Sequence, residues 1–300
     1  VYFRRIINIL MHNFKSFLDE GKSEMLSEKL IMLNNGRKDG QIVFLAGGAG
    51  SGKGFAATNF MEKEKFKVRD VDEWKKVFQK IADTQAKYPE IKGLALKKPA
   101  DVAKLHMFIK KLGLKDKTLD LMLGQLKDRK KLPNIMFDIT AKDTKDVSQF
   151  LPRLLTAGYN PANIHLVWVL TDYKIAIKQN ADRDRVVPSD IMLQTHKGAS
   201  ETVYSYVTGE GKKMQINGEI HVILNNKENT VMFTPSGNDR TSKISGKKNG
   251  VVVKDFTYLT LKKRGKALIK IDKVMKQLYY WVVDNIPKSD FQKALTDTIK

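Results

Sequence analysis

Short, uninterrupted apolar runs alternate with longer segments of helical apolar spacing along the first two thirds of the chain. A continuous apolar run of about four to eight residues is typical of a strand that is buried on both faces. Four such strands are predicted, at residues 41–46, 66–70, 133–138 and 163–170. The intervening segments predict helices at residues 55–64, 71–82, 100–112, 117–130, 143–157, 172–181 and 188–206. This alternation favours an α/β fold with a parallel sheet flanked by helices.

The two ends of the chain follow other patterns. Residues 14–33 have the apolar spacing of an amphipathic helix. After Gly209, the apolar segments 219–224 and 230–233 predict an antiparallel β-hairpin, and two helices are expected beyond residue 264. The chain therefore divides into three predicted units: an N-terminal helical segment at 1–37, a core at 38–208 and a C-terminal α+β appendage at 209–300.

A glycine-rich loop joins the first predicted strand to the helix after it. Residues 47–53 read Gly-Gly-Ala-Gly-Ser-Gly-Lys, which has the Walker A spacing. Glycines let backbone N–H groups curl around phosphate oxygens, and the helix N-terminus points its dipole at the anion. The pattern predicts a P-loop NTPase or kinase core that binds ATP or GTP through Gly47, Gly48, Ala49, Gly50, Ser51, Gly52, Lys53 and Gly54.

The metal site is predicted less directly. Gly54 stands where the motif has a Ser or Thr hydroxyl that binds Mg²⁺. Thr58, one helical turn further, is an alternative hydroxyl. Asp138 ends the third strand, where P-loop proteins hold Mg²⁺ through water, and Thr140 follows it closely. We predict Asp138 and Thr140 as the metal site; as alternatives, each residue caps the turn or helix that follows.

Three further residues are candidates for catalysis beside Lys53. Asp72 follows the second strand, where a carboxylate can accept the proton of an attacking hydroxyl; it also suits a helix N-cap. Arg183 and Arg185 precede a predicted helix, from which they would neutralise charge on the transferring phosphoryl group. The alternative for the arginines is a surface ladder of ion pairs.

Composition narrows the class of protein. The 300 residues contain no cysteine, so disulfides and thiolate chemistry are excluded, and no apolar run is long enough for a membrane span. The net charge of +21 attracts polyanions, so nucleic acid is an expected partner through a basic surface, with evenly solvated lysines as the alternative. Between residues 241 and 273 the basic residues are Lys243, Lys247, Lys248, Lys254, Lys262, Lys263, Arg264, Lys266, Lys270 and Lys273.

The order of these motifs resembles zeta-toxin-like P-loop kinases, and phage-encoded members look closest because some carry Gly after the P-loop Lys. The similarity spans residues 38–208. It implies that the Asp138 strand neighbours the P-loop strand and that a phosphoryl group moves to a hydroxyl, which in zeta toxins belongs to UDP-N-acetylglucosamine. By position, Lys53 would bind phosphate, Asp72 act as base, and Arg183 and Arg185 close over the phosphates. The string Asp138-Ile-Thr-Ala departs from the toxins, so the acceptor stays open.

These observations predict a phosphotransferase that moves the γ-phosphoryl group of ATP or GTP, with Mg²⁺, to a hydroxyl acceptor. Two alternatives remain: a nucleic-acid-associated ATPase, which the charge favours, and a structural protein that keeps a P-loop fold without turnover, which Gly54 favours. Ile139 occupies the place beside Asp138 where an ATPase would carry a catalytic Glu. We expect a cytoplasmic protein, and the resemblance predicts a phage origin.

Overall fold

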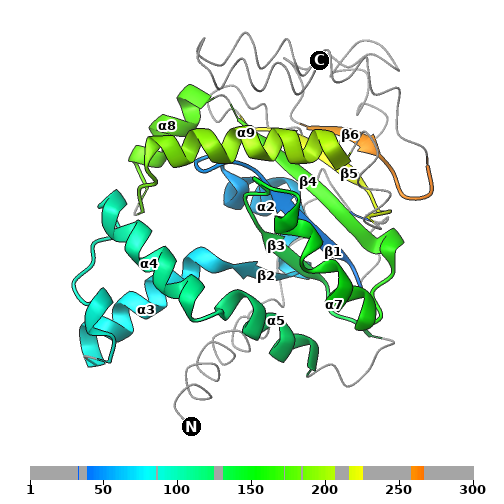
Figure 1. The fold of residues 1–300 in the computed structure, drawn as a ribbon. Coiled ribbons are helices and arrows are strands. Elements are labelled where there is room, and N and C mark those ends of the chain that lie inside the picture. Colours follow the sequence, from blue (N-terminus) through cyan, green and yellow to red (C-terminus); the bar gives the residue numbers. More distant parts are fainter. Residues whose placement is uncertain are drawn as a thin grey trace.

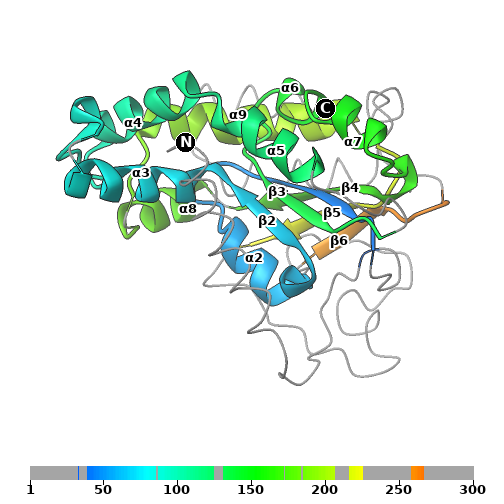
Figure 2. The same ribbon diagram turned by 90° about the horizontal axis from the view of Figure 1, so that it is seen from below.

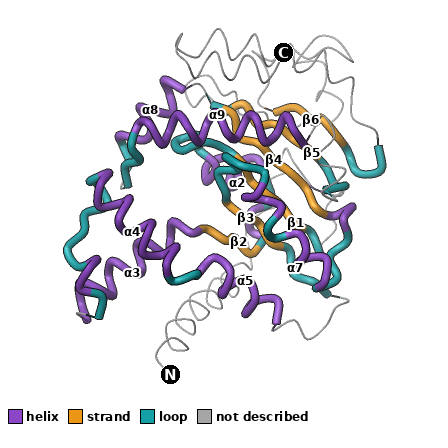
Figure 3. The backbone as a smooth tube through the Cα atoms, viewed as in Figure 1, coloured by secondary structure: helices purple, strands orange, loops and turns teal. Residues whose placement is uncertain are grey.

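The computed structural model describes residue 33 and residues 39–85, 87–124, 131–171, 173–183, 185–206, 216–225 and 258–266. These ranges form one sheet with helices on both faces (Figures 1 and 2). The strands are β1 (Ile42–Ala46), β2 (Lys67–Asp70), β3 (Ile135–Asp138), β4 (Ile164–Leu170), β5 (Ile220–Leu224) and β6 (Tyr258–Lys262). The helices, purple in Figure 3, are α2 (Lys53–Phe60), α3 (Val71–Gln85), α4 (Pro99–Lys111), α5 (Leu114–Gly124), α6 (Lys145–Ser148), α7 (Leu151–Thr156), α8 (Tyr173–Ala181) and α9 (Ser189–Ser205).

The strand order in the sheet is β2-β3-β1-β4-β5-β6. All neighbouring pairs are parallel except β5 and β6, which are antiparallel. The predicted α/β fold with a parallel sheet is therefore confirmed, and β3 is the direct neighbour of β1. The register places Leu45 opposite Asp138, so the carboxyl ends of these two strands meet at one edge of the sheet.

The two faces of the sheet are covered by different helices, as Figure 2 shows. On one face, the Phe137 ring lies 5.0 Å from Phe44 and 4.8 Å from Phe150, and α5, α7 and α9 complete this core. On the other face, Val43 and Leu45 pack against α2 through Ala56, Ala57 and Phe60. Burial of these apolar side chains holds the start of α2 at the carboxyl end of β1.

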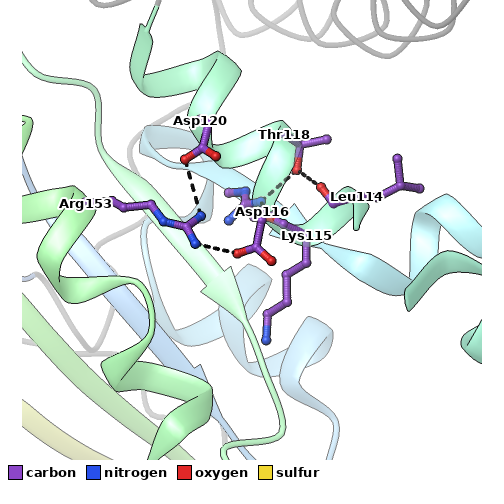
Figure 4. Close-up of polar contacts among 7 residues, drawn as sticks. Leu114, Lys115, Asp116, Thr118, Asp120 and Arg153 are labelled. Carbon is purple, nitrogen blue, oxygen red and sulfur yellow. Dashed lines mark hydrogen bonds and ion pairs between the residues drawn. The ribbon is translucent and has the colours of Figure 1, made fainter. Parts of the chain in front are cut away.

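Two guanidinium groups connect α5 to the rest of the core, and Figure 4 shows one of them, that of Arg153, with its two carboxylate partners. Arg69 of β2 donates to the Lys115 carbonyl oxygen at 2.7 Å and to Thr118 Oγ1 at 2.8 Å. Arg153 of α7 forms ion pairs of 2.7 and 3.3 Å with two carboxylates of α5, Asp116 and Asp120. Helix α5 is therefore connected to both β2, which is an edge strand of the sheet, and α7.

The structure differs from the sequence prediction at one helix. Residues 143–157 were predicted as a single helix, but α6 ends at Ser148 and α7 begins at Leu151. Pro152 accounts for the break, because its ring lacks an N–H and collides with the carbonyl four residues earlier in a continuous helix.

The sheet also extends past the predicted boundary at residue 208, since β5 pairs with β4 and β6 pairs with β5. The antiparallel neighbour of β5 is thus residues 258–262; the predicted hairpin partner 230–233 lies outside the described residues. So do the predicted helix at 14–33, apart from Leu33, and those beyond residue 266. The division into three units stays a prediction.

No helix in the described ranges combines the length and the apolar character that crossing a bilayer requires. The longest, α9, has 17 residues and includes Asp190, Lys197 and Glu201.

Candidate active site

The predicted phosphate loop leads from β1 into α2. Gly50 and Gly52 have φ of 76° and 77°, a left-handed conformation that glycine adopts without strain. A Cβ on Gly50 would lie 2.4 Å from the Ala176 carbonyl oxygen, so this position is also too crowded for a side chain. Gly52 is the N-cap of α2 and makes no side-chain hydrogen bond to the helix, and the N-terminus of a helix favours an anion.

Lys53 and Asp138 lie together at the carboxyl edge of the sheet. Lys53 is the first residue of α2, and its Nζ donates to the Gly47 carbonyl oxygen at 2.9 Å. The same Nζ lies 3.6 Å from Asp138 Oδ1. Both side chains are partly shielded from water, with exposures of 14% and 20%, so this ion pair is screened less than one on the open surface. The structure thus brings together the predicted phosphate-binding cation and the predicted metal-binding carboxylate.

Thr140 lies beside the loop, which it contacts through its backbone, whereas its side chain is directed to Asp146. Its carbonyl oxygen accepts from the Gly47 N–H at 3.3 Å, and its hydroxyl lies 3.5 Å from Asp146 Oδ2. Ala141, the next residue, has φ of 54°, an uncommon value for a residue with a side chain. Backbone strain of this kind recurs at functional sites, and here it directly follows the residue whose carbonyl contacts the loop.

Four polar side chains from other parts of the chain hydrogen-bond to the backbone of the loop, and none of them was predicted from the sequence. Ala49 N–H donates to Thr195 Oγ1 at 3.1 Å, and the Ala49 carbonyl accepts from His196 Nε2 at 2.8 Å. The Ser51 carbonyl lies 2.7 Å from Thr171 Oγ1 and 2.8 Å from Asn225 Nδ2. The partners in these contacts are up to 174 positions apart in the sequence, so no local sequence pattern predicts the contacts.

The loop fits a bound phosphate group on two independent observations. The glycine conformations form a concave backbone in which N–H groups can face an anion. The Ser51 hydroxyl is buried, and among the described residues it has no hydrogen-bond partner. A buried polar atom without a partner is costly, and a bound phosphate oxygen would supply the missing contact.

The second predicted carboxylate lies at the start of α3. Asp72 is the second residue of this helix, directly after β2. Asp70, the last residue of β2, is opposite Asp138 in the register of β2 and β3. Neighbouring in-register residues of parallel strands project from the same face, so the backbone places Asp70 beside Asp138, on the face that carries α2. The role predicted for Asp72 stays a prediction.

Arg183 and Arg185 lie in the loop between α8 and α9, Arg183 exposed and Arg185 half-buried. Asn180 closes the base of this loop, because its side chain donates to the Val187 carbonyl at 2.8 Å and accepts from the Val187 N–H at 3.0 Å. Val186 N–H donates to the Leu96 carbonyl at 3.2 Å, which links the loop to the segment before α4. We call residues 182–188 the arginine loop.

A metal ion would find few protein ligands here. In the part of the chain that the structure describes, no group of three or more His, Cys, Asp or Glu side chains could hold one. Gly54 is exposed, and a Cβ built on it would meet no atom within 4 Å. Asp138 suits Mg²⁺, which is commonly held by one or two carboxylates together with water and substrate phosphates.

Comparison with known proteins found neither a matching family model nor a matching curated protein. Among solved structures, the chain is similar to the complex of AvrRxo1-ORF1 and AvrRxo1-ORF2 with ATP, with 13% identity and a TM-score of 0.48 over 95% of this chain and 82% of that one. A structure of the PezAT chromosomal toxin–antitoxin system of Streptococcus pneumoniae matches with 14% identity and a TM-score of 0.39 over 72% and 75% of the two chains. Deoxyadenosine kinase from M. mycoides with bound dATP matches with 14% identity and a TM-score of 0.32 over 65% and 94%.

These identities and TM-scores are low, so the fold class rests on the chain's own geometry. A parallel sheet with the order β2-β3-β1-β4, a glycine loop after β1, and Lys53 at the start of α2 define an α/β protein with a P-loop core.

Proposed function

We propose that this chain is a phosphotransferase that moves the γ-phosphoryl group of ATP or GTP to a hydroxyl acceptor. The observation that carries the proposal is the position of Lys53, in the first turn of α2 and 3.6 Å from Asp138 on the adjacent strand. A lysine at the end of a glycine loop can neutralise the β- and γ-phosphates of a nucleotide. Asp138 can hold Mg²⁺ through water, and that ion would supply further neutralisation of phosphate charge when it is bound.

In the proposed reaction, the acceptor oxygen forms a bond to the γ-phosphorus while the bond from that phosphorus to the β,γ-bridging oxygen breaks. The nucleoside diphosphate leaves, and the acceptor proton passes to a carboxylate. Asp72 is the proposed base, and Asp70 is the second candidate because β2 ends beside Asp138. Phosphoryl transfer needs little covalent help from the protein, so alignment and charge neutralisation account for most of the catalysis.

Arg183 and Arg185 are proposed to neutralise the transferring group. Their loop is closed at its base by Asn180 and leads directly into α9. An arginine that reaches the γ-phosphoryl group stabilises charge that develops in the transition state. We therefore assign the arginines to catalysis rather than to ground-state binding of the nucleotide.

The partner required by this function is a hydroxyl-bearing acceptor, and nucleic acid is a further proposed partner through the basic segment 241–273. A nucleotide-dependent kinase without cysteine also suits the proposed cytoplasmic location.

Transfer of labelled phosphate from γ-labelled ATP or GTP tests the proposed function. The chain should label one class of hydroxyl compound in a panel of nucleosides, sugar nucleotides and RNA ends. Asp138→Asn should reduce labelling and raise the Mg²⁺ requirement. Release of free phosphate at the same rate with and without every acceptor would instead assign an ATPase, and absence of both reactions would favour a structural role.

A further inference from the structure

The phosphate loop is held by side chains on its outer side, and the pattern of these contacts is specific. The carbonyls of Ala49 and Ser51, two residues apart, each accept from a side chain of a distant element. In a planar trans peptide the C=O and the following N–H point in opposite directions. The N–H groups of Gly50 and Gly52 are therefore turned away from the side chains that bind those carbonyls.

This orientation is the one that anion binding requires. A backbone nest binds phosphate when successive N–H groups face the anion and the carbonyl dipoles face away from it. Rotating a peptide unit toward the wrong side would present a negative carbonyl end to the phosphates. The outer contacts thus select the arrangement of the loop that suits a nucleotide before one is bound.

His196 of α9 is the central member of this set. Its Nε2 must donate, because its partner is a carbonyl oxygen. Burial lowers the pKa of His196 to about 4, and the Lys53 ammonium adds to the effect, so the imidazole is neutral at pH 7. A Cβ on Gly48 would lie 2.2 Å from the His196 ring, which shows how closely the ring covers the loop. Tyr173 contacts the ring edge-on, with 5.6 Å between ring centroids.

Helix α9 reaches three parts of the site at once. Thr195 and His196 bind Ala49, as described above. Gly198 packs on the segment after Thr140, where an added Cβ would lie 2.2 Å from the Lys142 carbonyl oxygen. The helix begins at Ser189, directly after the arginine loop. Thr195, His196 and Gly198 all belong to α9. The position of this helix and that of the phosphate loop therefore depend on each other.

We propose that His196 is a positioning residue, which holds the Ala49 carbonyl outward through Nε2 and so keeps the phosphate loop ready for a nucleotide. This inference rests on the proposed nucleotide-binding function. It assigns no contact between His196 and the nucleotide; the side chain acts only through the loop backbone.

Two substitutions of similar size separate this role from simple packing. The amide nitrogen of glutamine can occupy the place of His Nε2, whereas that of asparagine lies near the place of Nδ1 and is too short to reach Ala49. His196→Gln should therefore keep the affinity for ATP, measured by calorimetry with Mg²⁺, equal to that of the original chain within the error of the measurement. His196→Asn should lower it about tenfold, because a buried carbonyl loses its donor and the peptide unit is free to turn.

The melting temperature of each variant is measured alongside. If His196→Asn does not fold, Thr171→Val provides the same test at the Ser51 carbonyl, where Asn225 still donates; a loss of about threefold is expected. Equal ATP affinity in the original chain, His196→Asn and Thr171→Val would overturn the inference and leave the proposed function intact. Equal loss in His196→Gln and His196→Asn would also overturn it, because packing alone would then explain the effect. If the original chain binds neither ATP nor GTP, the proposed function itself fails.

Discussion

At the scale of single residues, Lys53 and Asp138 form the centre of the candidate site, with Lys53 Nζ 3.6 Å from Asp138 Oδ1. The glycine spacing and Lys53 lie within one short sequence motif, so they can be recognised without knowing the fold. The position of Asp138 beside Lys53 was predictable because a carboxylate after a buried strand has a known place in such folds, and its role in metal binding stays a prediction. His196 and Asn225 were missed because the contacts that give them importance form only when the chain folds.

The first prediction at this scale concerns which carboxylate, that of Asp72 or that of Asp70, acts as the general base. Asp72→Asn should leave ATP affinity unchanged and reduce phosphoryl transfer by about two to four orders of magnitude, which is the usual contribution of general-base catalysis. The measurement is single-turnover transfer to whichever acceptor the labelling panel identifies. Full transfer in Asp72→Asn, together with a loss in Asp70→Asn, would move the role of base to the last residue of β2.

Acid stability provides a second prediction. Burial lowers the pKa of His196 to about 4, against an ordinary value of 6.5. Between these pH values the unfolded chain binds a proton on this residue and the folded chain does not, so stability is lost as the pH falls through that window. The free energy of unfolding should drop by up to about 3 kcal/mol from this group.

Denaturant unfolding at pH 7 and pH 4.5 measures that drop, with His196→Gln as the matched comparison. Burial also lowers the pKa of His165, to about 3, and this residue contributes equally in both chains. The same pH dependence with and without His196 would contradict the prediction.

At the scale of elements, strands β1 to β5 and most helices followed from apolar periodicity, because buried strands and amphipathic helices have distinct repeats. The order of the strands did not follow from periodicity; the resemblance implied one part of it, the pairing of β3 with β1. The break between α6 and α7 was overlooked although Pro152 was visible in the sequence. β6 was not foreseen as the partner of β5, since pairing between segments distant in sequence has no local signal.

Helix α2 offers a direct test of the metal site. Gly54 is exposed in its first turn with open space around its Cα, so a small side chain fits there. Gly54→Ser restores the hydroxyl that the motif ordinarily supplies to Mg²⁺ and should lower the Mg²⁺ concentration needed for half-maximal transfer severalfold. Gly54→Ala is the control: it should stabilise the helix by up to about 1 kcal/mol, as serine partly does, without adding a ligand. An identical Mg²⁺ dependence in the two variants would place the ion elsewhere.

At the scale of the whole molecule, the proposed phosphotransfer site does not explain the excess of positive charge. The net charge of +21 is far larger than nucleotide binding requires. Because β5 and β6 belong to the central sheet and Asn225 contacts the phosphate loop, removing everything after residue 209 would also damage the core. Substitution is therefore a better test of the basic segment than truncation.

Binding of an RNA or DNA oligomer should depend steeply on salt. The logarithm of the affinity should fall by about 0.7–0.9 per phosphate neutralised for each unit of log salt. Replacing Lys247, Lys248, Lys263 and Lys266 with Gln should flatten that slope while leaving ATP affinity unchanged. No binding at low salt, or an unchanged slope in the variant, would assign these lysines to surface solvation.

A calorimetric titration of the chain with ATP and with GTP, in the presence of Mg²⁺ and beside the Lys53→Ala variant, tests the proposed phosphate loop most directly. The original chain should bind at least one of the two nucleotides saturably. Lys53→Ala should bind it about tenfold more weakly or worse, because a charged contact worth on the order of 1.5–3 kcal/mol is lost. Its melting temperature without nucleotide should stay close to that of the original chain. Equal affinity in the two chains, or binding of neither nucleotide by the original chain, would contradict the central claim that residues 47–53 form a working phosphate loop.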